Sequence, residues 1–143
     1  MGSKSNYLEL RLLDHVLGAG TATTPATVYM ALYSAVPSDT GGGTELTSGS
    51  APGYARLAIT NDPTTFPAAT TNGTSGKGEK TVAVAQSFAA NSGGSNWPTV
   101  LGWGLFDAST GGNLLLWGEI AALAITPSAQ FVIAAGTVLW RED

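Results

Sequence analysis

Cysteine is absent from this chain of 143 residues, and charged residues are scarce. Without cysteine the protein has no disulfides, no thiol catalysis and no Cys-based zinc site, so we expect its stability to come from packing or assembly. Charged residues make up 11% of the sequence, against roughly 25% in typical soluble proteins. This low charge indicates that much of the surface is committed to contacts with other proteins.

Clusters of basic residues and long apolar runs are also missing. Six Lys and Arg residues stand against ten Asp and Glu residues, which gives a net charge of −4 and no basic patch for phosphate binding. No run approaches the roughly 20 apolar residues that span a bilayer, and the N-terminal residues do not form a basic and apolar leader. We therefore expect no nucleic-acid partner, no membrane partner and synthesis in the cytoplasm.

Glycine is abundant, with 19 residues, and it is spread between short apolar runs. Such punctuation indicates many tight turns and therefore short strands. The length suits one domain. We predict a mainly β protein, an antiparallel β-sandwich or barrel-like sheet with one N-terminal α-helix. A single β-rich domain would cover residues 1–143, with a helical segment at 1–19 and the β domain at 24–143.

Residues 6–17 carry the only strong helical pattern. Asn6 and Glu9 have the spacing of a capping box, and Gly18 supplies a stop. The apolar positions cover a broad arc of the helix, and polar residues lie opposite. The members of the apolar arc are Leu8, Leu10, Leu12, Leu13, Val16 and Leu17.

The apolar arc of this helix is wide for an element that rests on one surface. One interpretation is that the helix packs on its own sheet. The other is that part of the arc docks on a neighbouring subunit, since a small sheet covers only one side of a helix. The residues predicted for that interface are Tyr7, Leu8, Leu12 and Val16.

From Thr24 onward the period changes from 3.6 to 2, which is typical of strands. Residues 27–34 alternate so that one face is aliphatic and the other aromatic, and both faces should be partly covered. Residues 100–107 and 113–120 form the clearest hairpin. Glycines inside it indicate a bulge, or another backbone or an aromatic ring lying close, and Trp103 and Trp117 are the natural candidates for such rings. The core residues predicted from this hairpin are Leu101, Trp103, Leu105, Leu115 and Trp117.

Further strands are predicted at residues 54–60, 81–85, 130–134 and 137–140. In the strand at 54–60, Leu57 and Ile59 share one side, and Arg56 and Thr60 the other. The remaining segments are polar connections. Residues 37–53 form a long loop that is either functional or disordered. The Gly/Ser/Asn-rich stretches 70–79 and 91–96 should be flexible and lie outside any core.

Catalytic and metal-binding residue types do not gather into a recognisable motif. His15 is the only histidine, and its neighbour Asp14 points in another direction on a helix, so no triad is expected. Asp107 and Glu119 lie toward opposite ends of the hairpin, and Asp107 is better explained as a turn-former. Asp39 and Glu45 around three glycines match no calcium motif. We therefore predict a protein that is not an enzyme and binds no cofactor or metal.

Several blocks, read in order, resemble one phage family. They are SNYLELRLLDHVLG, PATVYMALYSAVPSD, GYARLAI, FPAAT, WPTVLGWGLFDASTGGNLLLWGEI and FVIAAG. The chain is similar over nearly its whole length to the small virion structural proteins of tailed phages that are commonly labelled tail-fibre-like. The resemblance implies a location in the virion after synthesis in a bacterial host, and phage virion proteins as partners.

Two functions fit the resemblance. The first is a cement or decoration protein that forms a homo-oligomer and stabilises the shell by binding the major capsid protein. Low charge, four Trp and four Tyr favour this interpretation, since aromatic residues are enriched in interface cores. The second is a tail-fibre or tail-tip component that binds tail proteins and contributes to host adhesion, for which long polar loops on a β scaffold are suitable.

Overall fold

The structure is a computed structural model that describes residues 2–142, and it is mainly β. Within these residues the one helix, α1, has 11 residues, which confirms the predicted mainly β class with an N-terminal helix. The elements are β1 (Gly2–Lys4), α1 (Asn6–Val16), β2 (Thr27–Ala35), β3 (Thr44–Glu45), β4 (Leu57–Thr60), β5 (Thr70–Thr71), β6 (Gly78–Val82), β7 (Gln86–Ser87), β8 (Val100–Phe106), β9 (Leu114–Leu123), β10 (Val132–Ile133) and β11 (Thr137–Arg141).

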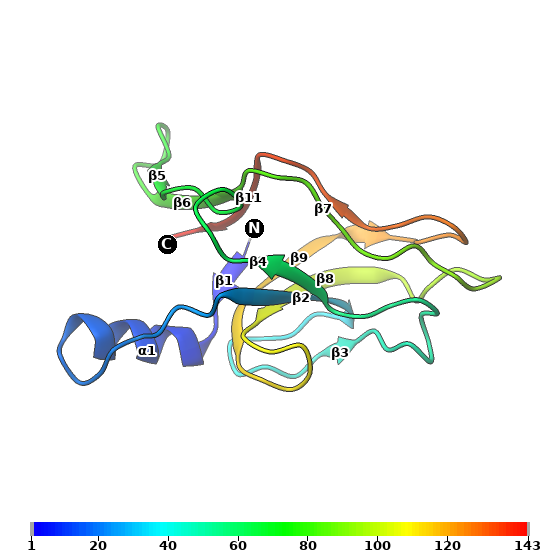
Figure 1. Cartoon of the computed structure of the whole chain (residues 1–143), viewed down its shortest axis with the longest axis horizontal. Helices are drawn as coiled ribbons and strands as arrows, with labels where there is room; N and C mark the ends of the chain where they lie inside the picture. Colours follow the sequence, from blue (N-terminus) through cyan, green and yellow to red (C-terminus); the bar gives the residue numbers. More distant parts are fainter. Residues whose placement is uncertain (1, 143) are drawn as a thin grey trace.

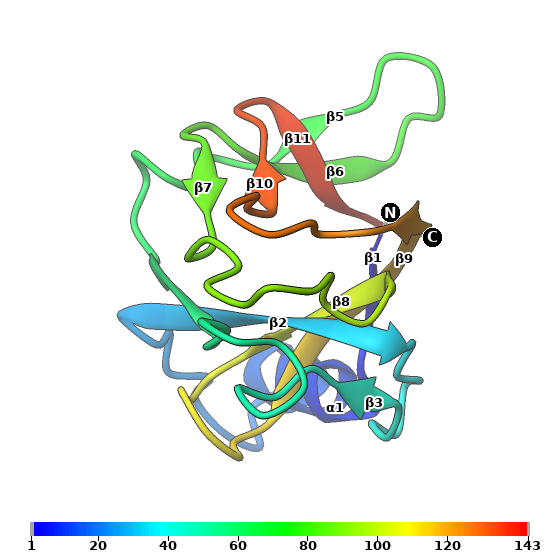
Figure 2. The same ribbon diagram turned by 90° about the vertical axis from the view of Figure 1, so that its right-hand side faces the viewer.

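A single nine-stranded sheet carries most of the chain, in the order β3-β2-β8-β9-β1-β11-β6-β5, with β4 paired to β2. All pairings are antiparallel except that of β1 with β11, which is parallel. The sheet folds over itself, so β2, β8 and β9 form one layer and β5, β6 and β11 the other (Figures 1 and 2). The small β7-β10 sheet lies along the open side, and α1 extends from the end of the first layer.

The main core fills the space between the two layers. Strand β2 sends its aliphatic side chains into it, and Ile59, Val82 and Leu139 come from β4, β6 and β11. Aromatic rings close the side of the core next to β7. Tyr54 stacks on Phe88 with ring centroids 6.2 Å apart, and Trp97 meets Tyr54 edge-on at 5.9 Å.

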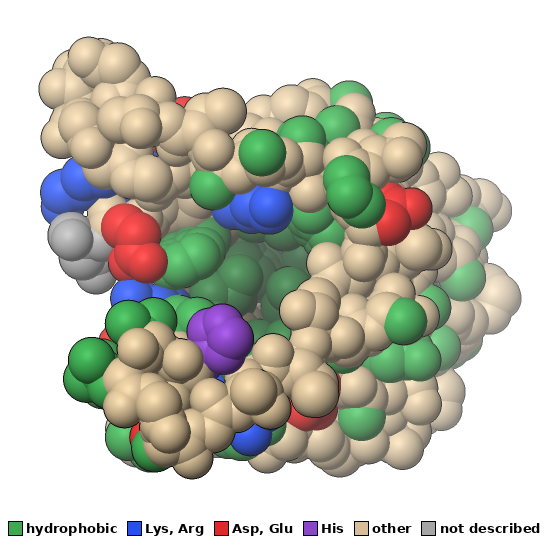
Figure 3. All heavy atoms as spheres, turned by 60° about the vertical axis from the view of Figure 1, so that its left-hand side comes forward, with side chains coloured by type: hydrophobic (Ala, Val, Ile, Leu, Met, Phe, Trp, Pro, Cys, Tyr) green, Lys and Arg blue, Asp and Glu red, His purple; other side chains and the backbone are tan. Residues whose placement is uncertain are grey.

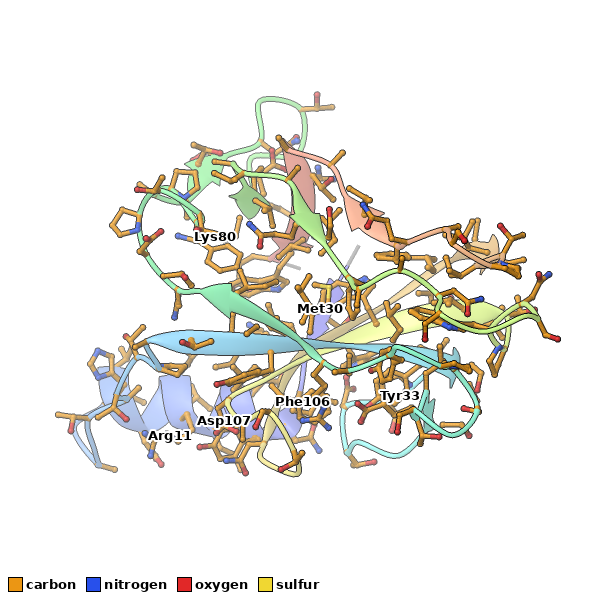
Figure 4. The ribbon with its side chains drawn as sticks, turned by 45° about the vertical axis from the view of Figure 1, so that its right-hand side comes forward. Arg11, Met30, Tyr33, Lys80, Phe106 and Asp107 are labelled. Atoms are coloured by element: carbon orange, nitrogen blue, oxygen red, sulfur yellow. The ribbon has the colours of Figure 1, made fainter. Side chains whose placement is uncertain are left out.

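The outer face of β2 is aromatic, as its alternation predicted. Tyr33, Ala31 and Phe106 form a second buried cluster with Leu114, and Trp117 packs partly against it. The aliphatic face, with Val28, Met30 and Leu32, belongs to the main core. In Figure 4 Tyr33 and Phe106 lie on the same side of β2 as α1, and Met30 lies on the other side.

The predicted hairpin forms, but one of its predicted core positions, Leu101, is wrong, and Trp117 contributes to the second cluster and not to the main core. The register shifts between Val100 and Gly102, so Val100 takes the core position and Leu101 is 36% exposed. Trp117 is half-buried against the aromatic cluster on the opposite face of the sheet. Trp103 and Leu105 are buried in the main core, and Leu115 packs against it, as predicted.

The aromatic rings beside the hairpin glycines also differ from the prediction. A Cβ at Gly104 would lie 3.1 Å from the rings of both Tyr33 and Phe106, and not against a tryptophan. The Trp103 ring instead lies over Gly2, where a Cβ would approach it to 2.7 Å. The hairpin glycines therefore do mark close packing, against the rings of Tyr33 and Phe106 at Gly104 and against the Gly118 backbone, 2.7 Å from a Cβ, at Gly102.

The N-cap of the helix lies one residue before the predicted one. Ser5 has extended backbone angles, is buried, and accepts a hydrogen bond of 3.2 Å from the amide of Leu8, so Ser5 and not Asn6 is the N-cap. The Ser5 hydroxyl also donates to the Leu114 carbonyl, and the Ser5 amide donates to that of Leu115 at 2.9 Å. The helix therefore starts from a fixed point on β9. Gly18 follows the helix with φ +83°, as expected for a stop.

Three of the predicted loops carry more structure than expected. The long segment 37–53 contains β3 and contributes Leu46 to the core. The stretch 70–79 forms the β5-β6 hairpin. The stretch 91–96 was expected outside the core, but Asn91 is 2% exposed, and its amide donates to the carbonyls of Ser95 at 2.9 Å and Ile125 at 3.0 Å.

The predicted strands are shorter or displaced in three places. The segment 54–60 is a strand only from Leu57, the segment 81–85 is replaced by β6, and the segment 130–134 is a strand only in β10. None of the helices in residues 2–142 has the length and apolar character needed to cross a membrane.

Candidate functional site

A cleft of about 540 Å³ opens on the aromatic face of the sheet, and we call it the loop cleft. The start of α1, the loop between β2 and β3, and the loop between β8 and β9 form its walls. Its lining residues are Ser5, Asn6, Tyr7, Tyr33, Asp39, Thr40, Gly41, Gly42, Arg56, Phe106, Gly111, Gly112, Asn113 and Leu114.

Arg56 ties the walls and floor of the loop cleft together. Its Nε and Nη2 donate to the two carboxylate oxygens of Glu45 at 2.9 and 2.8 Å. Its Nη1 donates to the carbonyls of Ala108 and Gly111, and its guanidinium lies 3.7 Å from the Phe106 ring centroid. The hydrogen bonds with Glu45 raise the pKa of Arg56. Glu45 therefore neutralises the positive charge of Arg56 within the protein. The hydrogen bonds of Arg56 to Ala108 and Gly111 hold the β8-β9 loop in place.

Tyr54 and Tyr33 complete the buried polar group around Glu45. The Tyr54 hydroxyl donates to Glu45 Oε1 at 3.1 Å and accepts from the Leu32 amide at 3.1 Å, and burial raises its pKa. Burial, with the charge of Glu45 as the next cause, raises the pKa of Tyr33 to about 12. Both phenols are therefore neutral at physiological pH.

Tyr33 differs from Tyr54 because its hydroxyl makes no hydrogen bond to any described residue. The side chain is 4% exposed and lines the loop cleft. Within residues 2–142 every buried side-chain N or O atom has a hydrogen-bond partner, so the unpaired Tyr33 hydroxyl is accessible to solvent. It can donate or accept a hydrogen bond there.

The two loop walls are held by side-chain contacts. Asp107 accepts from the amide and the side chain of Asn113, both at 2.7 Å, which confirms the predicted turn-forming geometry. Gly112 has φ +73°, and a Cβ there would lie 2.6 Å from Asp107 Oδ1. On the other wall, Asp39 Oδ1 accepts from the Trp117 indole at 3.0 Å. Both walls are therefore fixed in shape.

The residues considered for catalysis or metal binding do not come together. His15 is exposed, and its Nδ1 accepts from the Ala22 amide at 3.3 Å. Glu119 pairs with Gly102 along the hairpin, far from the turn that Asp107 opens. Glu45 is bound to Arg56, whereas Asp39 is bound to Trp117. Within residues 2–142 no group of three His, Asp or Glu residues has the arrangement to hold a metal ion.

Helix α1 provides a second candidate surface. Of the residues predicted for an interface, Leu8 and Leu12 are half-buried and line a cavity together with Pro25 and Leu115 of their own chain. Tyr7 is 37% exposed at the edge of the loop cleft, and Val16 is 75% exposed. The apolar residues that face solvent on this helix and its C-cap, here called the leucine stripe, are Leu10, Leu13, Val16 and Leu17.

A third surface is an apolar cleft of about 170 Å³ between the two layers, beside α1. Figure 3 shows it as a hollow lined by hydrophobic side chains. Leu8, Phe66 and Trp140 are among its lining residues, and Lys80 lies with them and donates to the Pro67 carbonyl at 2.6 Å. The sequence did not predict this cleft, because its residues come from seven separate segments.

The sequence also did not single out Tyr33 or Arg56 as site residues. Its period-2 pattern did place both side chains on the faces where they are found. No local signal pairs Arg56 with Glu45, since the two are joined only after β2, β3 and β4 assemble.

Comparison with known protein families gives one clear result. The family described as Podophage GP4 fiber I protein gp80 matches residues 3–141, which is nearly the whole chain. No curated protein matches the sequence. The match confirms the resemblance to tail-fibre-like virion proteins of tailed phages. The chain belongs to the Podophage GP4 fiber I protein gp80 family and is a structural protein of the phage virion.

Proposed function

We propose that this chain is a component of a phage tail fibre that assembles through α1 and contributes to host adhesion. The observation that carries the proposal is the family match, since the matched family is named for a fibre protein and covers residues 3–141. Tail proteins would then be its partners in the virion. The same proposal assigns no catalytic residue, cofactor, membrane or nucleic acid to the chain.

The leucine stripe supports assembly through the helix. No residue of α1 is fully buried, and Leu10, Leu13 and Leu17 are 64%, 58% and 79% exposed. Their spacing of three and four residues is that of a coiled-coil seam, which fits the same stripe on a second copy of the chain. Apolar residues exposed next to one another in this way are typical of a surface that contacts another protein.

The size of this contact indicates that several copies are needed. Burying the three leucines of both copies contributes at most roughly 9–18 kcal/mol, at about 1.5–3 kcal/mol each. Association of two proteins costs about 4–15 kcal/mol in lost freedom of motion. One helix contact is therefore marginal for a stable dimer, whereas a symmetric homo-oligomer or a second attachment point on the virion makes the contacts additive.

Capsid decoration, with the major capsid protein as partner, is the competing function. Its support is compositional, namely the 11% charged share and the aromatic residues that suit a shell contact. The leucine stripe serves both functions equally. What separates them is the location of the chain in the particle.

The test is an electron cryo-microscopy map of the intact virion together with gold-labelled antibody fragments raised against this chain. Density and label at the tail support the fibre proposal. Density at capsomer junctions, with label spread over the head, would overturn it in favour of decoration. A second readout is adsorption to host cells, which the same antibody fragments should block if the chain contributes to adhesion.

A further inference from the structure

We propose that the loop cleft binds an uncharged saccharide. This inference rests on the proposed function, since it names the class of host-surface ligand that a fibre with this cleft would recognise. It is argued from the free polar groups, the aromatic rim and the charge of the cleft.

The polar groups that remain free in the cleft suit hydroxyl groups of a ligand. The Tyr33 side chain is 4% exposed, and its hydroxyl has no hydrogen-bond partner among the described residues. The Asn6 side chain makes no hydrogen bond within the same residues, and Asp39 uses only Oδ1, for Trp117. The cleft thus offers a hydroxyl, an amide and a carboxylate oxygen, which can both donate to and accept from sugar hydroxyls.

The rim and size of the cleft fit a sugar ring. Tyr7, at the first turn of α1, is 37% exposed and lines the cleft. The C–H face of a pyranose packs against an aromatic ring of this kind, while the hydroxyl of the tyrosine remains hydrated. The volume of about 540 Å³ lies within the roughly 300–1,000 Å³ of ordinary ligand sites and has room for more than one sugar unit.

The charge of the cleft selects against anionic ligands. Arg56 is the one cation among the lining residues, and Glu45 neutralises it in a two-point contact. Its Nη1 is also occupied, by the carbonyls of Ala108 and Gly111. Asp39 lines the cleft, and Asp107 lies behind the Gly112 wall, so an incoming phosphate or carboxylate meets like charge without a free cation.

The experiment is a titration of the full chain followed by ¹H–¹⁵N correlation spectra. The neutral probes are maltose, lactose and cellobiose, and the charged probes are glucuronate and inorganic phosphate. At least one neutral disaccharide should shift the amide signals of residues 38–43 and 107–113, with the charged probes weaker. The proposal is overturned if no neutral probe shifts these signals, if the shifts lie elsewhere, or if a charged probe binds more tightly.

Three variants sharpen the test. Tyr33→Phe removes only the free hydroxyl and should weaken binding roughly 3- to 10-fold, as expected for one hydrogen bond. Asn6→Ala, at an exposed position, should weaken binding similarly. Tyr29→Phe is the matched control, since Tyr29 packs on the same aromatic cluster without lining the cleft, and it should bind as the wild type does. Equal affinity of Tyr33→Phe, Asn6→Ala and wild type overturns the site.

The outcomes distinguish this inference from the proposed function. Saccharide binding by a chain that maps to the capsid would retain the site and reject the fibre. A tail location with no saccharide binding would retain the fibre and reject the site.

Discussion

The Trp117 indole donates a hydrogen bond of 3.0 Å to Asp39, and this contact fastens the β2-β3 loop to strand β9 across 78 positions of sequence. The backbone amide of Asn6, the first residue of α1, donates to the Asp39 carbonyl at 2.9 Å, so Asp39 also holds the start of the helix. One wall of the loop cleft therefore depends on Asp39 and its two partners.

Trp117→Phe should loosen this wall without unfolding the protein. The loss of one hydrogen bond of about 1 kcal/mol predicts a fall in melting temperature of about 3 °C. Hydrogen exchange of the amides in residues 38–43 should quicken in the variant. Trp140→Phe, where the ring packs under Lys4, is the control and should leave exchange in this loop unchanged. Unchanged exchange in Trp117→Phe would show that the contact does not hold the loop.

Glu45→Ala should be among the most destabilising substitutions outside the main core. It leaves the Arg56 guanidinium, 8% exposed, without its carboxylate and removes the acceptor of Tyr54. Breaking a buried ion pair from one side costs about 3–5 kcal/mol. Glu142→Ala breaks the more exposed Lys4 pair and should cost less than about 1 kcal/mol. Urea unfolding of both variants gives the comparison, and equal costs would contradict the structural importance of Arg56.

Asn91→Ala should destabilise the protein by about 1–3 kcal/mol, because buried carbonyls and an amide lose their partner. The Asn91 side chain donates to Ser95 and Ile125 and accepts from the Gly93 amide at 2.9 Å. Chemical denaturation measures the loss. Asn96→Ala, exposed in the same segment, should stay within about 0.5 kcal/mol of the wild type. Similar values for the two variants would mean that Asn91 is not a structural anchor.

The leucine stripe makes a prediction about assembly. Replacing Leu10, Leu13 and Leu17 together with Ser should abolish oligomerisation and lower the melting temperature little, since all three are exposed. Leu8→Ser with Leu12→Ser should instead lower the melting temperature, because these residues are half-buried in their own chain. Sedimentation velocity and thermal unfolding on both variants separate assembly from folding. Full assembly of the triple variant would rule out the stripe as the contact.

Acid should destabilise the protein through two carboxylates. Hydrogen bonds from Arg141 hold the pKa of Glu79 below its ordinary 4.5, and the amide of Thr65 holds that of Asp62 below 3.8. A depressed native pKa favours the charged form, so its stabilisation is complete above these ordinary values and is lost as the pH falls below them. The urea midpoint should therefore drop as the pH falls below 4.5, and less steeply in Glu79→Gln. Identical slopes would exclude a contribution from Glu79.

Local patterns in the sequence predicted the parts of the fold that local forces decide. The alternation of residues 27–34 assigned Met30 to the aliphatic core and Tyr33 to the aromatic face, because side chains on a strand alternate whatever the partner strands are. The hairpin and the helix were also predicted from local patterns, the hairpin from its alternation and turn residues and the helix from its period of 3.6. Leu101 was misplaced because a register shift next to it moves the alternation by one residue.

The candidate site was beyond the reach of such patterns. Tyr33, Arg56 and Asn6 come from three segments, and the loop cleft exists only after the sheet brings these together. The choice of helix face shows the same limit. The sequence pattern identified the broad apolar arc of the helix. It could not show that Leu8 and Leu12 are the part of the arc that turns inward, because the attachment of Ser5 to β9 decides this.

The three-residue strand β1 joins the two layers, with β9 on one side and β11 on the other. Gly2 pairs with both Gly118 of β9 and Trp140 of β11, so β1 can connect the two layers only once both of these strands are available. Closure of the sheet is therefore a late event that joins sequence-distant segments, and such topologies fold slowly. During synthesis the edges of β9 and β11 stay unpaired and are open to strands of neighbouring chains. The pairing of three residues in β1 therefore protects two strand edges at once.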